Sequence, residues 1–295
     1  MTTKARDYWN SEAANGHKQK AYGFGTNPEV RYPQYEIRRE RVLEVLARRD
    51  AGRLLDAGCG SADVLIELLD RGWDGDGIDF APNMVKAARQ TLTEKGYEPA
   101  RVREGSITDL SAWPDKSFDV VICLGVLGYL PIEEQPKVYA EVRRVLKDKG
   151  LFLVQHVNAL FDVFTMNRFT VDFYQRELLP LFFPAAEVEE LTPRIAELLA
   201  NPTAPETGSR LASVRDTLRM TTEIPFAYAE KALSFGFRET DQVFMRMHAV
   251  PPLLFKRFPE LECRAIEREA ELCRHWAARL FSAGFLSVLV KAGQE

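Results

Sequence analysis

Short apolar segments alternate with amphipathic ones along the first half of the chain. Strands are predicted over residues 53–57, 75–79, 100–105, 117–126 and 151–157, of which 117–126 is strongly apolar and β-branched. The segments between them place apolar residues three and four positions apart, which predicts helices over residues 61–72, 82–96 and 133–150. Strands that alternate with helices indicate a parallel sheet with right-handed crossovers.

This alternation stops after Val157 and resumes near residue 228. The stretch between, residues 158–227, is rich in phenylalanine and has helical patterns near 185–200 and 209–222. We expect it to form an insertion over one end of the sheet. A helix, a strand, a helix and a last strand are then predicted over residues 226–234, 241–250, 259–283 and 285–293.

The predicted fold class is therefore α/β, with a doubly wound, mostly parallel, seven-stranded sheet and an antiparallel last strand. The chain divides into three parts. Residues 1–35 form an N-terminal cap, residues 36–157 with 228–295 form the sheet domain, and residues 158–227 form a helical insertion. Aromatic residues are frequent in the cap. Tyr22, Tyr32 and Tyr35 either contact a substrate or cofactor there, or pack within the cap itself.

Arginines cover much of a helix predicted over residues 34–49. They are Arg38, Arg39, Arg41, Arg48 and Arg49. We favour a solvated helix face for them, and contact with an anion or RNA is the alternative.

Composition narrows the class of protein. The chain has 295 residues and a net charge of −4, which argues against a nucleic-acid surface as the main function. It has no run of about 18 apolar residues and starts without the apolar core of a signal peptide, so we expect no membrane span and a cytoplasmic location. None of the four cysteines has a CxxC spacing, so no metal site is expected.

A glycine-rich loop follows the first predicted strand. Gly58 and Gly60 let the backbone turn tightly and approach a ligand, next to the start of a helix that favours an anionic group. Asp79 stands at the end of the second strand, 21 residues after Gly58, where its carboxylate can accept both hydroxyl protons of a ribose. The pattern therefore predicts a site for a ribonucleoside with an anionic group.

The motifs DAGCGSAD, GIDFAPNMV, SFDVVICLGVLGYL and LKDKGLFLV, taken together, resemble those of class I S-adenosylmethionine-dependent methyltransferases. The resemblance covers roughly residues 36–160 and, more loosely, the last 60 residues. It implies a Rossmann-like methyltransferase fold and S-adenosylmethionine as the cofactor.

The resemblance also implies a role for individual residues. Asp56, Gly58 and Gly60 would face the methionine part of the cofactor, and Asp79 would hold the ribose. Phe80 or Met84 would pack the adenine. Leu124 would present its backbone to the methionine ammonium.

One motif departs from the family. Where many members have an acid that meets the adenine amino group, this chain reads Gly105-Ser106-Ile107. Ser106 and Ile107 are therefore expected beside the adenine. Whether Ser106 or the more distant Asp109 meets the amino group stays open.

Methyl transfer to a hydroxyl needs a base, whereas an amine acceptor need only arrive neutral. His156 and His248 each follow or close a strand on the expected cofactor side, so the two are candidates to flank one pocket. Tyr129, after the fourth strand, is the third candidate. A structural role for each is the alternative.

We therefore expect a methyltransferase that acts on an oxygen or nitrogen of a small metabolite, with sugar-linked and secondary metabolites among the candidate acceptors. An NAD-dependent oxidoreductase, an RNA or protein methyltransferase and a non-catalytic relative are the alternatives. The oligomeric state stays open, with a homodimer among the choices.

Overall fold

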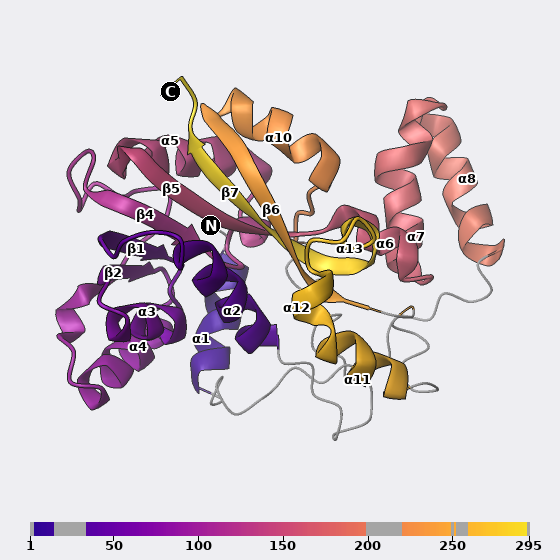
Figure 1. Cartoon of the computed structure of the whole chain (residues 1–295). Coiled ribbons are helices and arrows are strands. Elements are labelled where there is room, and N and C mark those ends of the chain that lie inside the picture. Colours follow the sequence, from indigo (N-terminus) through magenta and orange to yellow (C-terminus); the bar gives the residue numbers. More distant parts are fainter. Residues whose placement is uncertain (1–2, 15–33, 199–219, 249–250, 252–258, 294–295) are drawn as a thin grey trace.

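The computed structural model describes residues 3–14, 34–198, 220–248, 251 and 259–293. Seven strands form one sheet in the order β3-β2-β1-β4-β5-β7-β6 (Figure 1). The strands are β1 (Arg53–Ala57), β2 (Asp74–Asp79), β3 (Val102–Glu104), β4 (Phe118–Cys123), β5 (Leu146–Val157), β6 (Phe237–Met247) and β7 (Ser282–Lys291). The first five are parallel, and β7 runs antiparallel to both β5 and β6, which confirms the predicted fold class.

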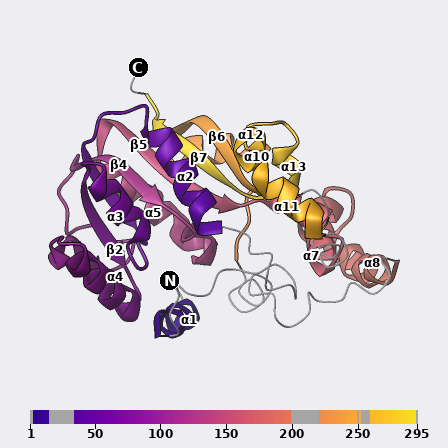
Figure 2. The same ribbon diagram turned by 60° about the horizontal axis from the view of Figure 1, so that its bottom comes forward.

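Helices cover both faces of the sheet (Figures 1 and 2). On one face lie α2 (Gln34–Leu46), α3 (Asp63–Asp70) and α4 (Pro82–Glu94). On the other lie α5 (Gln135–Val145) and α10 (Pro225–Ser234). The remaining helices are α1 (Thr3–Ala14), α6 (Ala159–Phe164), α7 (Arg168–Phe173), α8 (Ala185–Leu198), α11 (Pro259–Glu267), α12 (Glu269–Leu272) and α13 (Ala278–Phe281).

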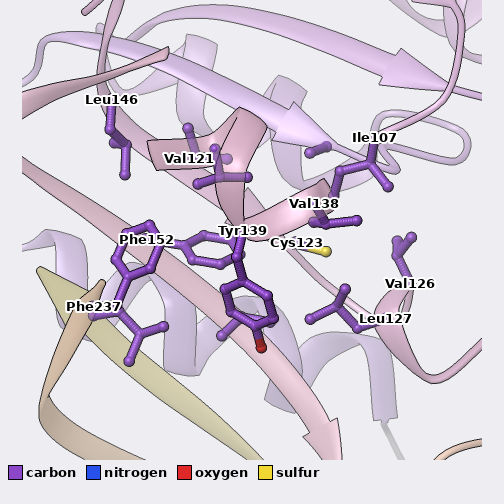
Figure 3. Close-up of a cluster of buried hydrophobic side chains, with 14 of the residues drawn as sticks. Ile107, Val121, Cys123, Val126, Leu127, Val138, Tyr139, Leu146, Phe152 and Phe237 are labelled. Atoms are coloured by element: carbon purple, nitrogen blue, oxygen red, sulfur yellow. The ribbon is translucent and has the colours of Figure 1, made fainter. Parts of the chain in front are cut away.

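The central strands are buried on both faces, as their continuous apolar sequence requires. Val120 and Ile122 of β4 join the cluster under α2, α3 and α4, while Val121 joins the cluster under α5 and α10. In that second cluster Phe152 lies between two further rings (Figure 3). Its ring centroid is 6.0 Å from that of Tyr139 and 5.6 Å from that of Phe237.

The insertion leaves the sheet after β5, and α7 and α8 stand away from the sheet (Figures 1 and 2). The chain returns at Glu223, which forms a parallel bridge with Asn158. Most of the helix predicted over 209–222 lies outside the described residues, and its last three residues are not helical. The predicted three-part division stays a prediction.

Two boundaries were predicted wrongly. The helix after β4 ends at Val145, because Leu146 already pairs with Phe118 and starts β5. The helix predicted over 259–283 is three short helices, and β7 begins before Gly284. Gly284 is a close-packing position in the strand, where a Cβ atom would lie 2.8 Å from Nη2 of Arg246.

Among the described residues, no helix has both the length and the apolar character that crossing a bilayer requires.

Replacing Phe152 by alanine should lower the free energy of unfolding by about 3–5 kcal/mol, because the fully buried ring leaves a cavity between Tyr139 and Phe237. Urea denaturation measures the change. Phe182, which is 70% exposed, gives the matched control, and Phe182→Ala should change the same quantity by less than about 0.5 kcal/mol. Equal losses in both variants would contradict the proposed core.

Candidate cofactor-binding site

The loop between β1 and α3 folds over the tip of β2. The backbone N–H groups of Gly58 and Cys59 both donate to the carbonyl of Ile78, at 2.7 and 3.1 Å. Gly58 has φ +91°, and a Cβ there would lie 2.1 Å from Cγ2 of Val126. A glycine is therefore required, both by the backbone conformation and by the close approach of the chain after β4.

Asp79 is held at the tip of β2 by this loop. One carboxylate oxygen accepts the N–H of Gly60 at 2.9 Å and the other accepts the N–H of Ala81 at 2.9 Å. Burial raises the pKa of Asp79, and these backbone donors oppose the rise. A carboxylate has about four acceptor positions, so it can still accept a hydroxyl proton beside its backbone donors. The structure thus brings together the glycine loop and the acid that the sequence pairs with it.

Asp56 is the second buried carboxylate of the site, with 3% of its surface exposed. Burial raises its pKa to about 7. The positive charge of Arg38 opposes the rise, and the carboxylates of Asp79 and Asp63 add to it. A cation placed beside Asp56 would favour its ionised form.

Arg38 completes the group, although we had favoured solvent exposure for it. Its Nη1 lies 3.5 Å from Oε1 of Gln155 on β5, and 3.1 Å from where a Cβ of Gly125 would stand. Its guanidinium carbon lies 4.9 Å from the ring centre of Tyr35. Nε of Arg38 is buried without a hydrogen-bond partner among the described residues. The guanidinium therefore has donors left for an anion beside Asp56.

Arg41, one turn further along α2, also contradicts the solvated face. It is 5% exposed and donates to Sγ of Cys273 at 3.1 Å and to Glu44 at 3.0 Å. Arg48 and Arg49 are exposed, as expected. The tertiary contacts that bury Arg38 and Arg41 come from β5 and the C-terminal segment, so the helical pattern alone gave no signal for them.

The other residues expected at the cofactor lie around the same strand tips. Met84, Ile107 and Leu124 are buried, while Phe80 and Ser106 are partly exposed. The Oγ of Ser106 lies 2.8 Å from Oγ1 of Thr108 and accepts the N–H of the same residue at 3.2 Å. Asp109 is exposed and accepts the N–H of Ser111 at 3.0 Å. Their roles toward a cofactor stay predictions.

Helix α1, within the predicted N-terminal cap, lies across the tips of three of these strands. Asn10 pairs with Asn83 at the start of α4 through two hydrogen bonds, of 3.1 and 3.2 Å. Arg6 pairs with Glu104 at the end of β3, at 3.0 Å.

The ring of Trp9 on α1 meets that of Tyr129, after β4, edge to face at 5.4 Å. Tyr22 and Tyr32 of the predicted cap lie outside the described residues.

The two candidate histidines lie in or directly after strands that are not neighbours in the sheet. His156 pairs with Phe285 of β7, which pairs with Phe244 of β6. His248 therefore lies two strands away and four residues further along, about 16 Å from His156 at ~3.3 Å per residue and ~4.8 Å per strand. The strand order separates them, because β7 lies between β5 and β6, and whether both line one acceptor site stays a prediction.

Each histidine is enclosed by aromatic side chains. His156 is 5% exposed, with its ring 4.1 Å from that of Tyr228 and 5.0 Å from that of Phe285. Burial, with the charge of Lys231, lowers its pKa to about 3. His248 packs 5.0 Å from Phe161. A catalytic role for either residue, or for Tyr129, stays a prediction.

Comparison with known proteins defines the class. Residues 48–196, half of the chain, match a family model described as a methyltransferase domain. The crystal structure of magnesium protoporphyrin IX methyltransferase from Synechocystis PCC 6803 with bound SAH, the demethylated cofactor, has the same fold. Its TM-score is 0.57 at 16% identity, over 98% of this chain and 99% of that one.

Curated relatives agree over a shorter stretch. A probable methyltransferase, ltbC, of Aspergillus luteorubrus is 34% identical over 33% of this chain and 37% of its own length. Demethylmenaquinone methyltransferase of Bacillus velezensis is 29% identical over 42% of this chain and 53% of its own. The chain thus spans about half the length of these relatives.

The chain belongs to the methyltransferase-domain family and has the Rossmann-like methyltransferase fold.

The raised pKa of Asp56 predicts how the ligand-free protein responds to pH. In the folded protein Asp56 keeps its proton up to about pH 7, whereas in the unfolded chain it loses it near pH 3.8, so its contribution to stability falls as the pH rises between these values. Asp56→Asn removes this dependence. Relative to the wild type, the variant should gain about 2 kcal/mol in free energy of unfolding between pH 5 and pH 8.

Urea denaturation at both pH values measures this gain. Asp74→Asn, at the exposed start of β2, is the control and should show no such gain. Parallel behaviour of the wild type and Asp56→Asn would show that Asp56 is ionised already at pH 5.

Proposed function

We propose that this enzyme transfers the methyl group of S-adenosylmethionine to an oxygen or nitrogen of a small-molecule acceptor. The observation that carries the acceptor class is the position of α1, whose contacts with Asn83, Glu104 and Tyr129 bridge three strand tips. A helix across the site leaves little room for a polymer and suits an enclosed reaction. The relatives act on demethylmenaquinone and magnesium protoporphyrin IX by name, which supports a small acceptor.

Three charged side chains fit the cofactor. Asp79 accepts the ribose hydroxyls, and its two backbone donors hold the carboxylate ready for them. Asp56 lies beside the positive charges of the methionine part. Arg38, whose Nε is unpaired among the described residues, donates to the methionine carboxylate.

S-adenosylmethionine supplies an activated methyl group with a neutral thioether as leaving group, so leaving-group departure needs no acid. The task of the chain is to orient the acceptor, exclude water and, for a hydroxyl acceptor, remove a proton. The sequence argument for an oxygen acceptor rested on two histidines in one pocket. Since they lie apart, oxygen and nitrogen acceptors stand equal.

Calorimetry with SAH tests the ribose contact. Asp79→Asn should weaken SAH binding by about 10- to 100-fold, because it removes a charge-assisted hydrogen bond worth about 1.5–3 kcal/mol. Asp74→Asn, at the opposite end of the same strand, is the control. The side chain of Asp74 is 63% exposed and pairs with Arg101. We expect wild-type affinity from this variant.

Two results would count against this site. Binding of NAD in place of SAH would favour an oxidoreductase. Unchanged SAH affinity in Asp79→Asn would show that Asp79 does not bind the ribose.

A comparison of SAH with methylthioadenosine tests the role of Arg38. Arg38→Met should weaken SAH binding about tenfold or more, because the α-carboxylate loses a guanidinium partner. Methylthioadenosine carries the same nucleoside without the amino-acid part, so its affinity should not change. Equal losses for both ligands would show that Arg38 supports the fold of the site and does not bind the carboxylate.

A further inference from the structure

The chain that returns from the insertion is joined to the loop after β4. We call residues 220–223 the exit segment and residues 124–130 the β4 loop. The N–H of Thr221 donates to the carbonyl of Gly128 at 2.8 Å. Glu223 is fixed to the end of β5 by two backbone hydrogen bonds of 2.9 Å, one to Val157 and one from Ala159. The exit segment thus lies between the β4 loop and β5.

An ion pair links Glu223 of the exit segment to Lys231 of α10. Nζ of Lys231 donates to Oε1 of Glu223 and, at 3.2 Å, to Oε1 of Gln135. The buried amide nitrogen of Gln135 then donates to Oγ1 of Thr221 at 3.2 Å and to the carbonyl of Leu127 at 3.5 Å. Helices α5 and α10, which carry these side chains, lie on the same face of the sheet (Figure 1).

Lys231 therefore decides how the amide of Gln135 is turned. An amide oxygen accepts and an amide nitrogen donates, so the ammonium can hold only the oxygen. With the oxygen held, the nitrogen must face the exit segment and the β4 loop. Two successive carbonyls of that loop, those of Leu127 and Gly128, are thus held by groups that Lys231 and Glu223 orient.

The pair is poorly suited to a role in stability alone. The side chains of Glu223 and Lys231 are only 15% and 27% exposed, so both charges are largely removed from water. Burial raises the pKa of Glu223, and the Lys231 charge opposes this. Apolar residues would fix α10 to the sheet without that desolvation cost, but they would not orient an amide.

We propose that Lys231 and Glu223 are positioning residues for the β4 loop. They hold its backbone so that Leu124 and Tyr129, at either end, keep their places at the cofactor site, and they set the insertion in register with that loop. This inference rests on the proposed function, together with the sequence predictions that Leu124 presents its backbone to the cofactor and that Tyr129 is a candidate catalytic residue.

The experiment compares four variants: Lys231→Met, Glu223→Gln, the double variant, and Lys231→Arg. SAH affinity by calorimetry, thermal stability and amide hydrogen exchange of the ligand-free protein are measured on each. Lys231→Met should weaken SAH binding about fivefold and speed exchange of the Tyr129 and Leu130 amides, which bond within the loop at 3.0 and 3.1 Å. Glu223→Gln should act in the same direction, and Lys231→Arg should retain the wild-type values.

The double variant separates positioning from stability. It carries no unpaired buried charge, so its melting temperature should recover relative to the single variants. Its SAH affinity should stay low, because nothing then orients the Gln135 amide. Lys147→Met is the matched control, since Lys147 pairs with Asp119 at 2.8 Å at the other end of the sheet. It should bind SAH as the wild type does.

The proposal is overturned if Lys231→Met and the double variant bind SAH normally and only their melting temperatures change. It is also overturned if exchange in the β4 loop is the same in all variants. A wild-type protein that binds no SAH would overturn the proposed function instead, and the exchange rates would still test the positioning role.

Discussion

The hydrogen bond from the Gly60 amide to the Asp79 carboxylate organises the cofactor site. It ties the loop after β1 to the tip of β2, and the Gly58 amide adds a second tie to Ile78. The same loop touches Val126 so closely that Gly58 leaves no space for a side chain. Three strand tips are thus set relative to one another by backbone contacts within the chain, and little rearrangement is needed for a nucleoside to bind.

Charge is the second constraint on this site. Asp56 and Asp79 are both buried, and burial raises the pKa of Asp56, a rise to which the Asp79 carboxylate adds. Arg38 offsets this only in part. A ligand that brings positive charge to Asp56, a carboxylate to Arg38 and hydroxyls to Asp79 would satisfy all three groups, and S-adenosylmethionine carries each of them. Two buried carboxylates repel further negative charge. They would therefore favour this cofactor over a dinucleotide, whose pyrophosphate would add negative charge beside two acids.

The sheet and the glycine loop could be predicted because both leave local signals. Val120, Val121 and Ile122 form an apolar β-branched run, and the loop glycines stand at a fixed distance from Asp79. Arg38 and the histidines gave no such signal. Periodicity shows that Arg38 lies off the apolar face of its helix, but only β5, more than a hundred residues later, determines that it points to the site. Likewise, the separation of His156 from His248 depends on β7 lying between their strands.

Segments outside the common sheet surround the site at the positions where an acceptor must enter. Helix α1 contacts the elements around the strand tips through Asn10, Arg6 and the edge of Trp9, and Ala5 is buried. The insertion, by contrast, is anchored at its exit by strand-like backbone bonds and a largely buried ion pair. The β4 loop contacts both segments, since Tyr129 meets Trp9 of α1 and Gly128 accepts the N–H of Thr221, so a change in the position of this loop would be felt by the helix and by the insertion alike.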